Sequence, residues 1–175
     1  LFNGELPNSS EVDNFKTKVF SHSTLPSPVG KVIHSMSGNS HPMGVLSSAL
    51  QALGGCFPHL CTNTRPADID SFEEAASLIV ASIPSIAAST YRSSKGENMP
   101  EIGNVFSYCE NFLHLMFGSA SAEPIDSSIS KALDLIFLLH ADHEQNCSTS
   151  TCRMIASGGA NAFASWSGAV SALWG

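Results

Sequence analysis

Apolar residues recur along most of this chain at intervals of three and four positions, which is the spacing of one face of an α-helix. The clearest such stretch begins at Asp126 and ends at His140. No stretch keeps the strict alternation of apolar and polar residues that is typical of a half-buried strand. The pattern therefore predicts an all-α fold, a multi-helical bundle.

Prolines, glycines and polar clusters divide this pattern into separate elements. We expect helices at 8–20, 43–53, 70–92, 106–117 and 126–140, with a kink or a restart at Pro84. Gly54 and Gly55 should end the second of these helices. A turn is expected at 25–31, and loops are expected at 56–70 and 93–103.

Residues 154–174 carry no charge over twenty-one positions, which is the length of a membrane-spanning helix. However, Ala, Ser and Gly dominate the stretch, and small residues recur at every fourth position. These are Ala160, Ala164, Gly168 and Ala172. Such a stripe lets another helix approach closely, so we predict a tightly packed core or interface helix rather than a membrane span.

The composition narrows the function classes. Charged residues make up 13% of the 175 positions and hydrophobic residues 43%, which excludes a disordered chain. Eight basic against fifteen acidic residues give a net charge of −7, and no basic cluster is present, so a nucleic-acid partner is not expected. With so few charged residues, part of the protein surface must be apolar and must be covered by another chain or domain. This favours an oligomer or a part of a larger protein.

Five cysteines form an odd set, which is not typical of a disulfide framework. Two pairs share a C-x4-C spacing, whereas zinc sites prefer C-x2-C turns. We therefore expect free, buried thiols in a reducing compartment.

One segment, residues 139–153, combines a high density of polar side chains with the end of an apolar helix. We expect the preceding stretch, Leu133 to Leu139, to be buried on most faces. Polar groups in a partly buried position must form hydrogen bonds with one another or with a polar ligand. Because patterns for nucleotide binding, H-E-x-x-H and G-x-S-x-G are absent, this segment is the candidate site.

The candidate side chains are an amide, a hydroxyl and two imidazoles, from Asn146, Ser148, His140 and His143. His140 and His143 are three positions apart and share roughly one helix face. The other two residues join His143 at one pocket if the helix ends near Asn146. Such a donor-rich set suits an anionic, oxygen-rich small molecule.

Other interpretations remain open. His140 could only cap its helix or form a hydrogen bond within the core. His140 and His143 could hold zinc together with Asp142 or Cys147, although this spacing is a weak ligand pattern. Elsewhere, His41 is more typical of a helix cap than of a ligand, and lone arginines such as Arg92 are typical of salt bridges within the fold.

Residues 138–150 read L-L-H-A-D-H-E-Q-N-C-S-T-S, which resembles the L-H-A-D-H-E-x-N-x-S-T motif of the citrate synthase family. Shorter matches are L-F-N-G-E-L-P at 1–7, H-P-M at 41–43, P-S-I-A-A at 84–88, E-N-F-L at 110–113 and A-L-W-G at 172–175. These matches follow one another in order along essentially the whole chain. They resemble the shorter, bacterial-like branch of the family.

The resemblance implies that residues 1–175 are part of the large helical domain of a citrate synthase, truncated at both ends. The family condenses acetyl-CoA with oxaloacetate to citrate and CoA, at the entry to the tricarboxylic acid cycle. It implies a homodimeric parent with acetyl-CoA and oxaloacetate as small-molecule partners. No cofactor is implied, because acetyl-CoA is a substrate, and neither a membrane nor a nucleic-acid partner is expected.

The resemblance also implies roles for the candidate residues. The position of His143 binds oxaloacetate in the family, and that of Ser148 forms a hydrogen bond with the first catalytic histidine. Asn146 helps to hold this arrangement, and His140 has a supporting role. The family's catalytic groups, two histidines and an aspartate, are expected beyond Gly175, so no catalytic residue and no metal ligand is assigned within the chain.

Two alternatives to a citrate synthase stay open. A 2-methylcitrate synthase, which uses propionyl-CoA, would share all these motifs. A protein of another class, a non-catalytic helical module with a structural metal, would share only the helical pattern. The compartment also stays open between the cytoplasm and the matrix of a mitochondrion or peroxisome.

Overall fold

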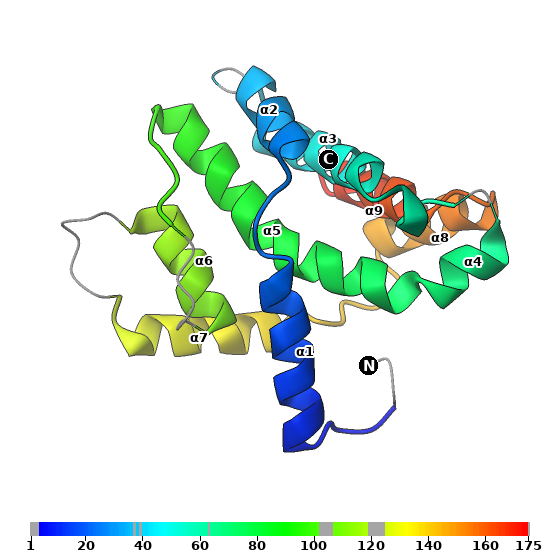
Figure 1. Ribbon diagram of the computed structural model, residues 1–175, viewed down its shortest axis with the longest axis horizontal. Coiled ribbons are helices and arrows are strands. Elements are labelled where there is room, and N and C mark those ends of the chain that lie inside the picture. Colours follow the sequence, from blue (N-terminus) through cyan, green and yellow to red (C-terminus); the bar gives the residue numbers. More distant parts are fainter. Residues whose placement is uncertain are drawn as a thin grey trace.

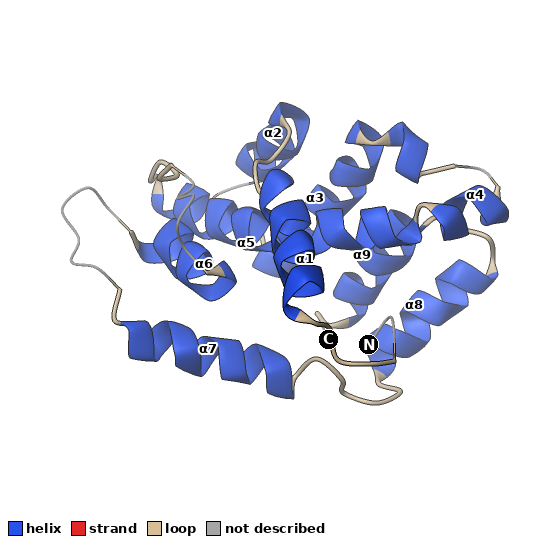
Figure 2. Cartoon of the chain, turned by 60° about the horizontal axis from the view of Figure 1, so that its bottom comes forward, coloured by secondary structure: helices blue, strands red, loops and turns tan. Residues whose placement is uncertain are grey.

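The computed structural model describes residues 4–36, 38, 40–62, 64–101, 107–118 and 125–174 of the chain (Figure 1). Within these ranges the regular elements are helices and none is a strand, which confirms the predicted all-α class (Figure 2). The α-helices are α1 (Ser9–Ser21), α2 (Ser27–Met36), α3 (Pro42–Cys56), α4 (Arg65–Asp70), α5 (Phe72–Lys95), α6 (Tyr108–Phe117), α7 (Ser127–Leu139), α8 (Cys147–Ser157) and α9 (Ala162–Ala172). A short 3-10 helix, η1, spans Pro58–Leu60.

The long helix α5 crosses the molecule and separates two groups of helices (Figure 1). On one side α2, α3 and α9 pack together, and α8 packs on α9. On the other side α6 packs against α5, and α7 packs mainly against α6. The buried core belongs to the first group and includes apolar side chains of α2, α3, α5 and α9. Its largest members are Ile33, Leu50, Leu53, Leu78, Ile86 and Phe163.

The turn predicted at 25–31 was wrong, because α2 begins inside it. Pro28 is the second residue of α2, where the missing N–H has no helical acceptor in any case. Val29 and Ile33 are fully buried in the core, and their burial outweighs the poor helix propensity of the neighbouring glycine. Likewise, the loop predicted at 56–70 contains η1 and α4.

Helix α5 is continuous through Pro84, so the predicted restart is absent. Proline cannot donate a hydrogen bond to the carbonyl four residues earlier, which belongs to Val80. The hydroxyl of Tyr108, in α6, donates to this carbonyl instead, with an oxygen–oxygen distance of 2.8 Å. The neighbouring helix thus satisfies the group that the proline leaves unpaired.

The single helix predicted over residues 154–174 was also wrong, since the chain turns at Gly158 and Gly159 and forms α8 and α9. The turn needs a residue in the left-handed region, and Gly159 has a φ of 86°. The predicted close approach is present at Gly168, where an added Cβ would collide with the side chain of Ile155 in α8. Among the described helices, none is long and apolar enough to cross a membrane.

The α3–α9 contact joins two helices that are far apart in sequence. At its centre the Ser47 hydroxyl lies 2.9 Å from the Ser167 hydroxyl and 2.8 Å from the Ser171 hydroxyl. At one end the indole of Trp174 stacks on the ring of His41, with 4.9 Å between ring centroids. The predicted cap at His41 is also present, because its Nδ1 accepts from the backbone N–H of Met43. Serines, aromatic rings and close backbones therefore hold this pair of helices together.

At the other end of the α3–α9 contact, Gly54 lies against the buried ring of Phe163. A Cβ added to Gly54 would lie 2.8 Å from the Cβ and Cγ atoms of Phe163. The prediction that Gly54 and Gly55 end the helix was wrong, because α3 continues to Cys56. We expect Gly54→Ala to lower the free energy of unfolding by about 1–3 kcal/mol, as overpacking of a core does. Gly55→Ala is the matched control, because a Cβ there meets no atom within 4 Å.

The control should stabilise the helix by about 0.5–1 kcal/mol, since alanine is the better helix former. Thermal melts followed by circular dichroism compare the two variants. Shifts of the same sign and size in both would contradict this account of the helix contact.

Arg92 is a buried cation at the C-terminal end of α5. Its guanidinium donates hydrogen bonds to the backbone carbonyls of Leu115 and Gly118, which end α6. A third bond, 3.1 Å long, reaches the carboxylate of Glu97. The sequence predicted salt bridging for Arg92, and this ion pair confirms it, while the carbonyl bonds explain why the charge is buried.

Candidate functional site

The turn between α7 and α8 carries the candidate residues, and His140 ends α7. Its backbone N–H and its ring Nδ1–H both donate to the carbonyl of Ile136, the ring bond being 2.8 Å long. This is the local capping role that the sequence had left open for His140. The imidazole is therefore held at the helix end rather than directed at a neighbouring side chain.

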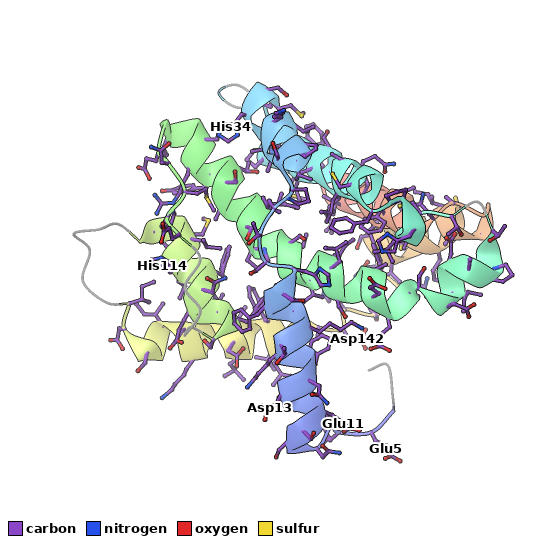
Figure 3. The ribbon with its side chains drawn as sticks, viewed as in Figure 1. Glu5, Glu11, Asp13, His34, His114 and Asp142 are labelled. Carbon is purple, nitrogen blue, oxygen red and sulfur yellow. The ribbon has the colours of Figure 1, made fainter. Side chains whose placement is uncertain are left out.

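The next residues form a tight turn centred on His143. The Asp142 carboxylate accepts from the backbone N–H of Glu144, with an oxygen–nitrogen distance of 3.1 Å. Glu144 has a φ of 50°, in the left-handed region that residues with a side chain rarely adopt. Asp142, labelled in Figure 3, marks the position of this turn beyond the end of α7.

Asn146 connects the turn to α8. Its Oδ1 caps the helix by accepting from the backbone N–H of Thr149 at 2.9 Å, and it also accepts from the Ser148 hydroxyl at 2.7 Å. Its Nδ2 donates to the carbonyl of His143 at 3.1 Å. Asn146, Ser148 and the backbone of His143 thus lie together. However, α7 ends at Leu139 and not near Asn146, so the prediction that His140 and His143 share a helix face was wrong.

The imidazole of His143 is exposed, and no hydrogen bond joins it to the rest of the described chain. Gln145, two residues later, accepts from Arg153 of α8 at 2.9 Å, which further fixes the turn. The backbone around His143 is therefore held at several points, while its ring remains available to a ligand.

The expectation of a partly dry site was wrong for this chain, because α7 is not buried on most faces. Leu138 and Leu139 are 71% and 69% exposed. The ring of Phe137 contacts Tyr108 and Phe112 of α6, at 6.4 Å between centroids in each case. Figure 2 shows the reason: α7 lies at the edge of the molecule, so the rest of its surface faces solvent.

The described ranges contain no group of three or more His, Cys, Asp and Glu side chains placed to hold a metal ion. The Nδ1 of His140 is already engaged with its own helix. The structural-metal alternative therefore gains no support from the turn that suggested it.

The family follows from comparison with known proteins. A family model described as "Citrate synthase, C-terminal domain" matches residues 1–175. The chain belongs to the citrate synthase family. The protein named Citrate synthase 1 in two strains of Mycobacterium tuberculosis (CDC 1551 / Oshkosh and ATCC 25618 / H37Rv) is 40% identical over 177 residues. That match covers 100% of this chain and 40% of the relative, so the chain spans well under half of the relative's length.

Solved citrate synthase structures share the fold. The enzyme of Pyrobaculum aerophilum superposes with a TM-score of 0.85 and 27% identity, covering 98% of this chain and 43% of that one. The enzyme of Thermotoga maritima MSB8 gives a TM-score of 0.79 and 28% identity, covering 98% and 42%. The enzyme of Thermoplasma acidophilum was solved as a ternary complex with carboxymethyl coenzyme A and oxaloacetate. It superposes with a TM-score of 0.86 and 21% identity, and the match covers 99% of this chain and 43% of that one.

Two cavities lie elsewhere on the described chain. One, of about 350 Å³, lies between α2, α3, α5 and α6 and is mainly apolar. The other, of about 430 Å³, has Phe72 and Trp166 among its lining residues. Neither is lined by His140, His143, Asn146 or Ser148.

All five cysteines are free thiols, as the sequence predicted, but they are not all buried. Cys147, the first residue of α8, is exposed. Cys109 of α6 is buried, and this burial, with a hydrogen bond to Asp134, raises the pKa of its thiol to about 11. Cys109 is therefore an unreactive packing group.

Proposed function

We propose that this chain is part of the large helical domain of a citrate synthase, which condenses acetyl-CoA with oxaloacetate to give citrate and CoA. The observation that carries the proposal is the family match over the whole chain, together with 40% identity to a citrate synthase. The ternary complex of the Thermoplasma enzyme, which holds a coenzyme A derivative and oxaloacetate, supports this choice of ligands. The reaction is an acyl transfer at the entry to the tricarboxylic acid cycle, and no cofactor is needed because acetyl-CoA is itself the substrate.

Within that reaction we assign the binding of oxaloacetate to His143. Its exposed ring forms no hydrogen bond with the described part of the protein, so its N–H can donate to an anionic keto-acid. Asn146 and Ser148 support it by fixing the start of α8, and His140 supports it by ending α7. The catalytic histidines and aspartate are proposed to follow Gly175 in the complete enzyme.

A homodimer is part of the same proposal. The outward surface of α7 exposes large apolar side chains that a soluble enzyme would cover. They are Ile129, Leu135, Ile136, Leu138 and Leu139. In the complete enzyme, further residues of the chain or a second copy would cover this face. That contact would also exclude water from the turn after α7, and hydrogen bonds are stronger where water is excluded.

The test compares the isolated 175-residue chain with a full-length protein that carries it. We expect full-length protein to release CoA only when acetyl-CoA and oxaloacetate are both present, and the isolated chain to release none. The reason is that binding groups alone do not replace a missing general base and its catalytic partners.

The same assay with propionyl-CoA distinguishes the 2-methylcitrate synthase. A kcat/KM that is higher with propionyl-CoA than with acetyl-CoA would replace the proposed substrate. CoA release by the isolated chain would contradict the placing of the catalytic groups beyond Gly175.

A further inference from the structure

Glu144 is the one non-glycine residue in the described ranges with a positive φ, and it directly follows His143. A side chain in this region crowds its own backbone, so the conformation persists only where surrounding contacts hold it. The turn at His143 must therefore contain groups that stabilise it.

Two side chains hold this turn, one on each side of His143. The Asp142 carboxylate accepts from the backbone N–H of Glu144 at 3.1 Å and so closes a ring around the His143 backbone. The Asn146 amide donates to the His143 carbonyl at 3.1 Å. The His143 ring has no hydrogen bond of its own in the described chain, so these contacts act by fixing the backbone from which the ring projects.

The Asp142 carboxylate has no cationic partner within 4 Å among the described residues. It also belongs to no metal-ligand group there. Its visible contact is a hydrogen bond to a backbone N–H. A neutral amide oxygen can accept the same bond, although a carboxylate accepts it more strongly. An asparagine at this position therefore keeps the accepting oxygen and the contact with the Glu144 backbone.

We propose that Asp142 is a positioning residue for substrate binding: it holds Glu144 in the left-handed conformation, and thereby directs the His143 ring at the substrate. The inference rests on the proposed function, because His143 is assigned to oxaloacetate there. It predicts that Asp142→Asn, which keeps the accepting oxygen, retains substrate binding and that Asp142→Ala does not.

The experiment uses full-length enzyme with Asp142→Ala, Asp142→Asn and a control, Asp126→Ala. Asp126 forms the same kind of bond, from the Ser128 backbone N–H at 2.8 Å, but at the opposite end of α7. We expect Asp142→Ala to lower kcat/KM for oxaloacetate about ten- to a hundredfold, as small misplacements of binding groups do, chiefly by raising KM. The kcat/KM of Asp142→Asn for oxaloacetate should stay within about threefold of the wild-type value, since this variant keeps the hydrogen bond.

The control separates positioning from general stability. Asp126→Ala should lower the melting temperature about as much as Asp142→Ala does, with kcat/KM unchanged. Equal losses of kcat/KM in Asp142→Ala and Asp142→Asn would show that the charge matters and overturn the proposal. An unchanged KM in Asp142→Ala would overturn it as well.

Amide hydrogen exchange at Glu144 tests the turn without any assay of activity. Exchange should be faster in Asp142→Ala than in wild type and should return to the wild-type rate in Asp142→Asn. Unchanged exchange in Asp142→Ala overturns the proposal even in an active enzyme. A wild-type protein without citrate synthase activity would instead contradict the proposed function, so the two failures are distinguishable.

Discussion

Replacing Arg92 with methionine is expected to lower the free energy of unfolding by about 2–6 kcal/mol. The guanidinium donates to the carbonyls of Leu115 and Gly118, both buried at the end of α6. Methionine fills similar space but donates nothing, and each buried carbonyl left unpaired costs about 1–3 kcal/mol. Urea unfolding followed by circular dichroism measures the change.

The matched control is Glu97→Gln, which removes the charge of the ion-pair partner. Glu97 is 53% exposed at its side chain, and exposed pairs contribute about 0–1 kcal/mol. We therefore expect a change below about 1 kcal/mol in this variant. If the two variants lose equal stability, the ion pair and not the carbonyl bonding would be the main role of Arg92.

Replacing His143 with glutamine in a full-length enzyme is expected to weaken oxaloacetate binding about ten- to a hundredfold. A charge-assisted hydrogen bond from imidazole to a keto-acid contributes about 1.5–3 kcal/mol, and glutamine cannot carry the positive charge. The melting temperature should hardly change, because no hydrogen bond within the described chain depends on this ring. Calorimetric titration of oxaloacetate, beside melting curves, measures both quantities.

His59→Gln serves as the control for this variant. His59 is exposed in η1 and lies 3.5 Å from the Glu74 carboxylate, so its loss should leave oxaloacetate affinity unchanged. A His143→Gln enzyme with wild-type affinity and a lowered melting temperature would remove His143 from the binding site.

The helices that the sequence predicted correctly have clear local signals. A capping box begins α1 at Asn8 and another begins α6 at Ser107, and both sets of hydrogen bonds are present. The misjudged elements depend on contacts from distant parts of the chain. Pro84 does not interrupt α5 because Tyr108 satisfies the carbonyl that it leaves, and no local pattern contains that information.

Burial was the harder property to predict. The apolar spacing of α7 is equally consistent with a core helix and with a helix whose partner surface lies outside the described chain. Leu138 and Leu139 are exposed, so α7 is not a core helix of the described chain. Sequence periodicity identifies the apolar face of a helix, but what covers that face depends on the complete molecule.

Within the candidate segment, the nearness of the residues could be predicted from the sequence, but their hydrogen bonds could not. The grouping of Asn146 and Ser148 with His143 follows from their nearness in sequence and from the end of α7 before them. The left-handed Glu144 could not be predicted, because glutamate has little preference for that region. Likewise, spacing alone does not tell which acceptor the Ser148 hydroxyl chooses, and that acceptor is the Asn146 amide oxygen.

The α3–α9 contact also constrains the order in which the protein can be made. Ser47 and Ser167 lie 120 positions apart, so α3 leaves the ribosome well before its partner exists. Until α9 arrives, Leu50 and Leu53 lack the Phe163 ring that completes their core, and closing so long a loop is entropically unfavourable. The core around Phe163 must therefore form after translation has passed α9, which makes the nascent chain up to that point a natural client for chaperones.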